Sequence, residues 1–474
     1  MNTIKRLNTK VVFTVSWLLV LSSCYVVKEY QRPELNTENL YRTDFLTDSA
    51  TIAMDSTSLA NISWRNLFTD PLLQGYIQQA LNNNLDIRIA LQSVEAAEAY
   101  VKQSKAAYYP TIDASLNYGL SKNSQNSALG QISDKAIGQF QLGANFSWEA
   151  DIWKKIRSME RATAATYFQS IEAHRAIKTR LVASVASTYY LLAALSEQIE
   201  IAERSIASRD SSLVTTRTLK AAGQVTEVAV KQMEAQVYDA QLIRLNLQQQ
   251  QRTLENAFCL LLNEPFHPVE RNALSAQTIQ TNLTTGVPAL LLANRPDVMQ
   301  AEYGLINAFE LTNVAKSNFY PSLMISASGG LQSVHLKDWL SVNSLFANIA
   351  GNLLQPIFYK RQLKTAYEVA QIRQEQALLS YEKTLLIAGN EVSNALFDYH
   401  TQTEAIALEE KRTEALSKAV NYSEQLLVNG LANYLEVLTA RQSVLATQLN
   451  LVNARYAQLN SIVNLYEALG GGWQ

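Results

Sequence analysis

The chain lacks the features that mark several common classes of protein. Its 474 residues carry 40 Lys and Arg against 42 Asp and Glu, so no basic surplus indicates a nucleic-acid partner. Its 2 Cys are too few for a disulfide framework. With only 16 Gly and 9 Pro, it has few residues that interrupt helices. These shortages favour long helices.

Catalytic signatures are absent as well. The sequence contains no P-loop, no G-x-S-x-G nucleophile motif and no paired-glycine nucleotide motif. Its 6 Met form no cluster. The histidines lack metal-ligand spacing and are interpreted as solvated or capping residues; they are His174, His267, His335 and His400. We therefore expect no enzyme activity, no metal site and no cofactor.

The N-terminus is a targeting segment. A basic stretch precedes the apolar run Val11–Leu21, which is too short for a membrane span of roughly 20 residues. Leu21-Ser22-Ser23-Cys24 follows and resembles the bacterial lipobox, whose cysteine thiol takes a diacylglycerol. We expect a lipoprotein signal peptide over residues 1–23 and a lipidated extended segment over 24–63. The alternative is an ordinary signal peptide that contains a cysteine.

Two consequences follow from the cysteine at position 24. The next residue, Tyr25, is not Asp, and by resemblance this favours export to the outer membrane. If Cys24 carries lipid, Cys259 has no disulfide partner. Cys259 lies in an apolar helical stretch, "LENAFCLLLN", and is interpreted as a small buried hydrophobic residue.

Four segments alternate strictly between apolar and polar residues. They are predicted as strands over about 111–121, 139–150, 322–332 and 344–356. Leu116, Leu142, Ile325 and Ile349 represent the apolar side, and Ser115, Asn145 and Ser326 the polar side. Each segment is about ten residues long, which suits a tilted transmembrane strand. A half-buried sheet in a soluble domain would give the same alternation.

The chain repeats itself. "SKAAYYPTIDASLNYGL", from Ser104, aligns with "AKSNFYPSLMISASGGL", from Ala315, and Pro110 matches Pro321 at an offset of 211. Gly223 and Gly430 match at an offset of 207 within "AAGQVTEVAV" and "VNGLANYLEV". Two matches at nearly one offset indicate duplication. We expect a first repeat over 64–285 and a second over 286–474.

Long helices fill most of both repeats. Residues 154–222 contain no Pro or Gly, and residues 362–429 contain only Gly389, which allows helices of about 100 Å. Returning helices are predicted over 224–262 and 434–469, and shorter helices over 86–107 and 295–318. Four strands cannot close on themselves in hydrocarbon, so several chains are expected to pool their strands.

Longer motifs carry a family resemblance. They are "WRNLFTDPLLQGYIQQALNNNLDIRIALQSVEAAEAYVKQSKAAYYP", "SWEADIWKKIRS", "NRPDVMQAEYGL", "QPIFYKRQLKTA" and "GLANYLEVLTARQSVL". In this order they resemble the TolC-like outer-membrane efflux proteins, most closely their lipid-anchored multidrug-efflux branch. The resemblance implies a mainly α chain with four transmembrane strands. It also implies a trimer with a 12-stranded barrel, a long helical periplasmic barrel and a mixed equatorial region.

The same resemblance implies a function without chemistry. The protein is expected in the bacterial outer membrane, lipid-anchored and extending into the periplasm. There it would be a passive exit duct for an inner-membrane RND-type pump and a periplasmic adaptor. A type I protein secretion or metal-cation efflux system remains an alternative. A coiled-coil adaptor without a channel is a further alternative, although adaptors have no use for four membrane-length strands.

Candidate site residues lie at the helical turns. Gly223 and Gly430 are expected to end their helices, since a residue with positive φ commonly does so. The resemblance implies that these tips close the duct and receive the adaptor. Asn429, Asn433 and Tyr434 are predicted to hold neighbouring helices together through side-chain hydrogen bonds. The basic pairs Lys154-Lys155 and Lys360-Arg361 are either solvated or mark the periplasmic rim of the barrel.

Overall fold

The structure is a computed structural model that describes residues 26–35, 37, 40–42, 59–128, 131, 135–279 and 290–473. The chain forms two compact units. The first contains Val94–Ser170, Ala301–Tyr381 and the N-terminal segment up to Glu34. The second contains Leu35–Ser93, Ile171–Gln300 and Glu382–Gln474.

The described residues are mainly helical, as expected. The α-helices are α2 (Trp64–Leu67), α3 (Pro71–Asn83), α4 (Leu85–Ala106), α5 (Lys155–Ala221), α6 (Glu227–Leu262), α7 (Leu291–Asn294), α8 (Pro296–Ser317), α9 (Gln362–Val428) and α10 (Tyr434–Ala468). Short 3-10 helices cover Leu59–Asn61, Leu274–Ala276, Leu336–Asp338 and Val342–Ser344. The two longest helices, α5 and α9, have 67 residues each.

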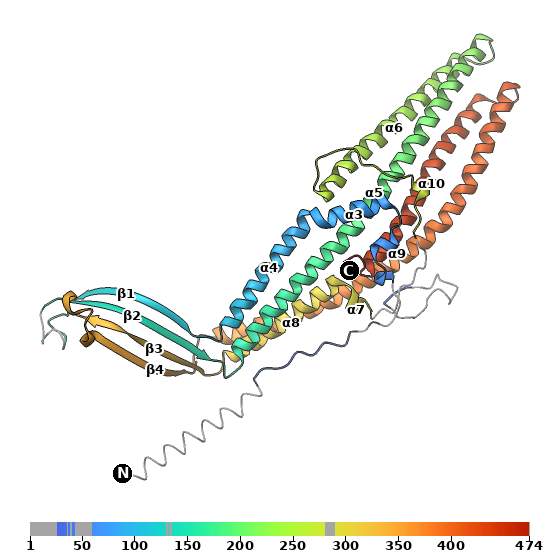
Figure 1. Cartoon of the computed structure of the whole chain (residues 1–474). Helices are drawn as coiled ribbons and strands as arrows, with labels where there is room; N and C mark the ends of the chain where they lie inside the picture. Colours follow the sequence, from blue (N-terminus) through green and yellow to red (C-terminus); the bar gives the residue numbers. More distant parts are fainter. Residues whose placement is uncertain are drawn as a thin grey trace. The chain divides into compact units, whose positions relative to one another are not determined.

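The first unit contains a sheet of four antiparallel strands in the order β1-β2-β3-β4 (Figure 1). The strands are β1 (Thr111–Ser121), β2 (Ile137–Ala150), β3 (Ser322–Ser333) and β4 (Leu345–Leu354). β1 has the predicted bounds. β4 ends two residues earlier than predicted, directly before Gln355 and Pro356, because proline cannot donate a ladder hydrogen bond.

Tryptophans fix the ends of the strands in the first unit. The indole Nε1 of Trp148, in β2, donates to the carbonyl oxygen of Tyr108 at 2.9 Å. Trp153 is buried, and its Nε1 donates to the carbonyl oxygen of Pro321 at 2.6 Å. These bonds connect the strand ends of the first repeat with the residue that opens β3.

The N-terminal segment packs along α8 within the same unit. Val26 is 1% exposed. Asn313, buried on α8, accepts from the Lys28 N–H at 3.2 Å and donates to the Lys28 carbonyl oxygen at 3.0 Å. Tyr30 stacks edge-on against Phe309, and Arg32 forms an ion pair with Glu302. The segment therefore runs antiparallel to α8, with its N-terminal end toward β3.

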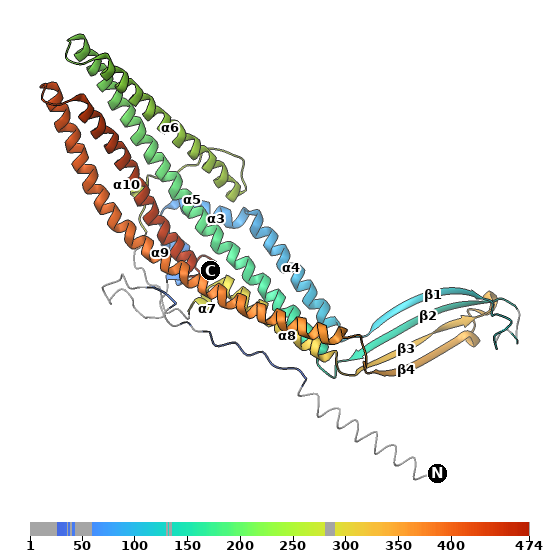
Figure 2. The same ribbon diagram turned by 180° about the vertical axis from the view of Figure 1, so that it is seen from behind.

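The second unit contains two helical hairpins. α6 returns beside α5, and α10 returns beside α9, as both views show (Figures 1 and 2). Apolar side chains from α5 and α10 share one core cluster, which includes Ala194, Ile201, Leu445 and Val452. A second cluster on α5 and α6 contacts Leu438 of α10. The hairpins are thus packed together by helix faces rather than by isolated contacts.

A buried polar cluster orders the short helices of this unit. Asp70 begins α3, and its carboxylate accepts the Leu72 N–H at 2.9 Å and the Tyr189 hydroxyl at 2.6 Å. Asn272 and Gln277 also donate to Asp70, at 3.0 and 2.7 Å. With every bond made to protein groups, the cluster holds the loop after α6 against α3 and α5.

Candidate functional site

The sheet is two-faced across all four strands. Leu116 lies opposite Leu142, Phe146 opposite Ala327, and Ala327 opposite Ile349. The pairing therefore places Leu116, Leu142, Ile325 and Ile349 on one face, as predicted. That face is built from Ile112, Ala114, Leu116, Tyr118, Leu120, Phe140, Leu142, Ala144, Phe146, Trp148, Leu323, Ile325, Ala327, Leu331, Leu345, Ala347, Ile349 and Leu353.

The opposite face is mostly polar. Its members include Asp113, Ser115, Asn117, Gln139, Gln141, Asn145, Ser147, Glu149, Ser322, Ser326, Ser328, Gln332, Asn348 and Asn352. The larger apolar exceptions are Ile137, Met324, Phe346 and Leu354. Because side chains alternate along each strand, one register keeps both faces uniform over four strands.

Much of the apolar face is exposed among the residues that the structure describes. Ile112 is 70% exposed, Leu116 is 68% exposed and Ile349 is 83% exposed. Contiguous apolar surface of this kind marks a membrane or protein contact. The outer strands β1 and β4 also have one unpaired edge each in the single chain. None of the helices that the structure describes combines the length and hydropathy required to span a bilayer.

The two hairpin turns have the same geometry. Gly223 has a φ of 73° and Gly430 a φ of 71°. In the first turn, the Gly223 and Gln224 N–H groups donate to the Lys220 and Leu219 carbonyls, both at 2.9 Å. In the second, those of Gly430 and Leu431 donate to the Leu427 and Leu426 carbonyls at 3.0 and 2.9 Å. Both are Schellman endings, and both glycines cap their helices as expected.

The polar residues at the second turn make local bonds. Asn429 Nδ2 donates to the Gln425 carbonyl oxygen at 2.8 Å, one turn back on its own helix. Asn433 is the N-cap of α10, and its Oδ1 accepts from the Leu435 N–H at 3.2 Å. Tyr434 is half-buried. Within one chain, the two asparagines therefore cap helix ends instead of bridging neighbouring helices.

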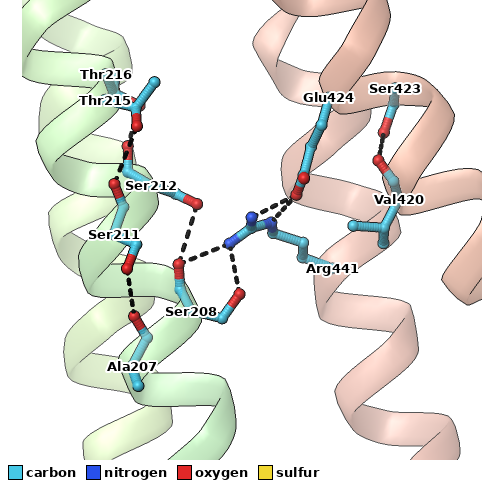
Figure 3. A network of polar contacts seen from close by, with 10 residues as sticks. All are labelled: Ala207, Ser208, Ser211, Ser212, Thr215, Thr216, Val420, Ser423, Glu424 and Arg441. Carbon is cyan, nitrogen blue, oxygen red and sulfur yellow. Dashed lines mark hydrogen bonds and ion pairs between the residues drawn. The ribbon is translucent and has the colours of Figure 1, made fainter.

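A different residue bridges the two hairpins (Figure 3). Arg441 of α10 donates from Nη1 to the carbonyl oxygen and Oγ of Ser208, on α5, at 2.9 and 3.1 Å. Its Nε donates to Oε1 of Glu424, on α9, at 2.7 Å, and Nη2 contacts the same oxygen. The Arg441 side chain is only 16% exposed. One guanidinium thus connects three long helices.

The surroundings of Arg441 are basic. A cavity of about 310 Å³ is lined by Arg204, Arg209 and Arg441 together with Ser208 and Asn421. Arg209 donates to the carbonyl oxygen and Oε1 of Gln236 on α6, at 2.8 and 2.6 Å. Burial lowers the pKa of Arg209, the charge of Arg441 lowers it further, and Asp239 opposes both. Arginine remains charged at neutral pH, so the two guanidinium groups repel.

Sequence reasoning missed this network because its partners are far apart along the chain. Ser208 and Arg441 are separated by 233 residues. "TARQSVL" carried no sign that one arginine in it faces α5. Cys24 lies outside the described residues. Cys259 is buried, as expected, with Sγ 3.6 Å from Nδ1 of His267.

No group of acidic, histidine or cysteine side chains in the described ranges has the arrangement of a metal site. The arrangement instead consists of long paired helices joined to a two-faced sheet. This combination defines a TolC-like channel protein. The model of the outer membrane efflux protein family matches residues 76–264 and again residues 287–471. The chain therefore belongs to the outer membrane efflux protein family.

Individual relatives match this chain over almost its full length. SilC of Salmonella typhimurium, a probable outer membrane lipoprotein, is 28% identical over 463 residues, covering 97% of this chain and 98% of SilC. TtgI of Pseudomonas putida, a toluene efflux pump outer membrane protein, is 28% identical over 462 residues, with coverages of 96% and 97%. The crystal structure of CusC superimposes with a TM-score of 0.82 at 25% identity, covering 94% of this chain and 100% of CusC.

These findings confirm the resemblance drawn from the sequence motifs. The protein is an outer-membrane efflux protein, and it acts as the exit duct of an efflux system. Efflux proteins of this family are not enzymes.

Proposed function

We propose that three copies of this chain pool their strands into a 12-stranded barrel and form a passive duct. The observation that carries this proposal is the sheet with one continuous apolar face and two open edges. Open strand edges are not tolerated in hydrocarbon, and small closed barrels need about eight strands. Joining β4 of one copy to β1 of the next satisfies both edges. The family resemblance supports three copies.

The two faces then have different roles. The apolar face contacts lipid, and the polar face lines a water-filled lumen. The lumen side carries serine, asparagine and glutamine, with Asp113 and Glu149 as its carboxylates. Such a lining offers no specific binding site, so cargo selection belongs to the inner-membrane pump. The protein itself catalyses no reaction and requires no cofactor.

The proposed anchor is a lipid on Cys24. Val26, two residues later, is buried in the unit that contains the sheet, and the segment runs toward the β3 end of α8. A diacylglycerol attached here would be held close to the strands that enter the membrane. SilC, a relative, is itself a probable lipoprotein. Cys24→Ala should abolish acyl labelling, whereas unchanged lipid incorporation would contradict the anchor.

The hairpin tips are proposed to receive a periplasmic adaptor, which links the duct to an RND-type pump. Gly223 and Gly430 give each chain two similar tips, so a trimer presents six related grooves. Bulky substitutions at either glycine should weaken adaptor crosslinking while the trimer still forms. Unchanged crosslinking would leave the two glycines as helix caps alone.

The gate is proposed to be held by Arg441. Its bonds to Ser208 are one of the polar links between the two hairpins, beside the bond from Gln198 to Asn453 at 2.6 Å, and a hydrogen bond to a charged group contributes about 1.5–3 kcal/mol. The nearby charge of Arg209 opposes this closed arrangement. Adaptor binding of similar energy could therefore move the second hairpin away from the first.

The gate can be tested by conductance in planar bilayers. Arg441→Gln should raise the resting conductance, because the amide cannot keep the bonds to Ser208 and Glu424 together. Arg412→Gln is the matched control, since the ion pair of Arg412 with Glu409 lies within α9 itself. If Asn433 and Tyr434 form hydrogen bonds between copies of the chain, the double variant Asn433→Ala/Tyr434→Ala should also raise the resting conductance. Unchanged conductance in the Arg441 variant would contradict the latch.

Two relatives indicate two different classes of cargo. TtgI is a toluene efflux pump protein, whereas CusC of Escherichia coli is a cation efflux system protein. The carboxylate of Asp113 on the polar face favours cations modestly, which keeps metal-cation efflux as the second candidate. Reconstitution of the whole system with each candidate pump, followed by transport of a metal ion or a solvent, would separate them.

A further inference from the structure

The two strand-to-helix exits differ strongly in exposure. After β2, Trp153 is 7% exposed and its indole is bonded to Pro321. After β4, three successive large side chains lie in the open: Ile357 is 94% exposed, Phe358 82% and Tyr359 55%. Contiguous exposed apolar side chains mark an interaction surface.

The exits also differ in how far their basic side chains are exposed. After β2, residues 151–164 contain four basic and two acidic residues, but Lys155 and Arg161 are only 39% and 43% exposed and pair with Glu149 and Glu310. After β4, residues 355–368 contain Lys360, Arg361 and Lys364 and one acidic residue, Glu368. Arg361 and Lys364 share Glu368, at 3.2 and 3.9 Å, and both side chains remain about two-thirds exposed. The second exit therefore keeps a net positive charge next to its apolar residues.

Both features lie directly beyond a proposed transmembrane strand. β4 ends at Leu354, so Ile357 follows within three residues and the basic residues follow within ten. Aromatic side chains followed by Lys and Arg are typical of the membrane–water boundary, where rings lie among the head groups and cations reach the phosphates. Charge complementarity therefore points to an anionic lipid surface.

We propose that residues 357–364, the exposed turn, insert into the inner head-group layer of the outer membrane and select anionic phospholipid, such as phosphatidylglycerol. This inference rests on the proposed membrane span. Ile357 and Phe358 supply apolar contact, and Lys360, Arg361 and Lys364 supply the selectivity. The first exit, whose Trp153 is buried and whose Lys155 and Arg161 pair with Glu149 and Glu310, makes no such contribution.

The test measures lipid retained by the full-length protein. The protein is reconstituted into vesicles of equimolar phosphatidylethanolamine and phosphatidylglycerol, re-extracted in mild detergent, and its bound lipids are quantified by mass spectrometry. The variant K360Q/R361Q/K364Q removes the charges and keeps polar, hydrogen-bonding side chains. The matched control, K411Q/R412Q/K418Q, removes three exposed basic charges from α9, the helix that follows the turn.

The wild-type protein and the control should retain lipid enriched in phosphatidylglycerol. The exposed-turn variant should lose the enrichment, at about fivefold for each charge, or about 1 kcal/mol. I357S/F358S should retain less lipid of both kinds and keep its preference. Equal enrichment in wild type and K360Q/R361Q/K364Q would overturn the inference.

Three further outcomes distinguish the lipid preference from the proposed membrane span on which it rests. If the exposed-turn variant alone loses trimer-sized migration, the turn is a contact between copies and the lipid role is wrong. If even the wild type fails to float with vesicles, the proposed membrane span is wrong and the lipid preference falls with it. If the variant floats as a trimer without its phosphatidylglycerol preference, the inference is supported.

Discussion

The two halves of the chain have hairpin turns of the same geometry but strand-to-helix exits of different structure. Gly223 and Gly430 adopt φ angles within two degrees of each other and close identical hydrogen-bond patterns. At the exits, Asp151 caps α5 by accepting from the Ile156 and Arg157 N–H groups at 2.8 and 3.0 Å. The second exit has Pro356 and an exposed apolar turn instead.

This difference separates what duplication preserves from what position changes. A hairpin tip needs one left-handed residue whichever half supplies it, so both tips keep glycine. Both exits place a lysine at a left-handed φ, 58° at Lys154 and 48° at Lys360, and they differ in having a carboxylate cap or a proline beside it. Asp151 therefore fixes the bend that lacks a proline. The exits are free to acquire separate roles in burial and surface contact.

The largest expected effect tests whether both halves contribute one lipid-facing surface. Leu116→Arg in β1 and Ile349→Arg in β4 should each destabilise the inserted barrel by about 2–4 kcal/mol if they lie at mid-membrane. Ser115→Arg and Asn348→Arg, on the polar face, should be tolerated and should alter conductance. The measurement is the amount of heat-modifiable trimer in outer-membrane fractions. Loss of trimer in the polar-face pair instead would place the register one residue out.

The second effect tests whether the left-handed glycine contributes equally to the stability of the two hairpin turns. Gly223→Ala and Gly430→Ala should each cost about 1–2 kcal/mol, because an L-residue is strained at positive φ. Neither new Cβ meets an atom within 4 Å, so crowding is not involved. Gly75→Ala, in α3, is the control: it also has free space but no positive φ, and should stabilise slightly. Thermal unfolding followed by circular dichroism would reveal unequal costs if the tips differ.

The third effect sharpens the contrast between the exits. Asp151→Ala should lower the stability of the first exit by about 1 kcal/mol, since two N–H groups of α5 lose their acceptor. Glu149→Ala is the control, because its ion pair with Lys155 is partly exposed and contributes about 0–1 kcal/mol. Hydrogen exchange of the Ile156 and Arg157 amides is the readout. Unchanged protection of these amides in Asp151→Ala would show that Asp151 does not cap α5.

The smallest effect concerns ion preference. Both carboxylates of the polar face, Asp113 and Glu149, come from the first half, and the second half supplies none. Asp113→Asn should therefore reduce cation preference modestly, seen as a shift of the reversal potential in a salt gradient. Asn348→Asp should increase it. Equal reversal potentials in both variants and wild type would show that the lumen charge lies elsewhere.

Local patterns explain how much of this fold could be predicted. The alternation of apolar and polar residues predicted all four strands, and glycine and proline predicted the helix ends to within a few residues. Both signals depend on neighbouring positions in the sequence. The predicted end of β4 was two residues too long. The 3-10 turns between β3 and β4 and the short helix α3 were not predicted. Asp70-Pro71 was a usable signal for α3, since Asp at the N-cap and Pro at the first position begin helices.

The candidate gate could not be predicted in the same way. Asn433 is polar and next to a turn, and these properties indicate a cap as readily as a bridge. Arg441 bridges only because α5 and α10 pack at one particular rotation, which depends on clusters such as Ile201 with Leu445. Contacts of this kind depend on packing between distant segments, and no local pattern encodes them.

The central claim, that β1 and β4 join different copies of the chain, can be tested by crosslinking. Ala114→Cys in β1 would be combined in turn with Ala347→Cys, Ile349→Cys and Gly351→Cys in β4. Opposed residues of antiparallel strands lie at distances that a disulfide can bridge. Under mild oxidation, at least one double variant should give covalently linked trimers, while every single variant should give monomers on denaturing gels. Covalent dimers in a single variant, or monomers throughout, would contradict the shared barrel.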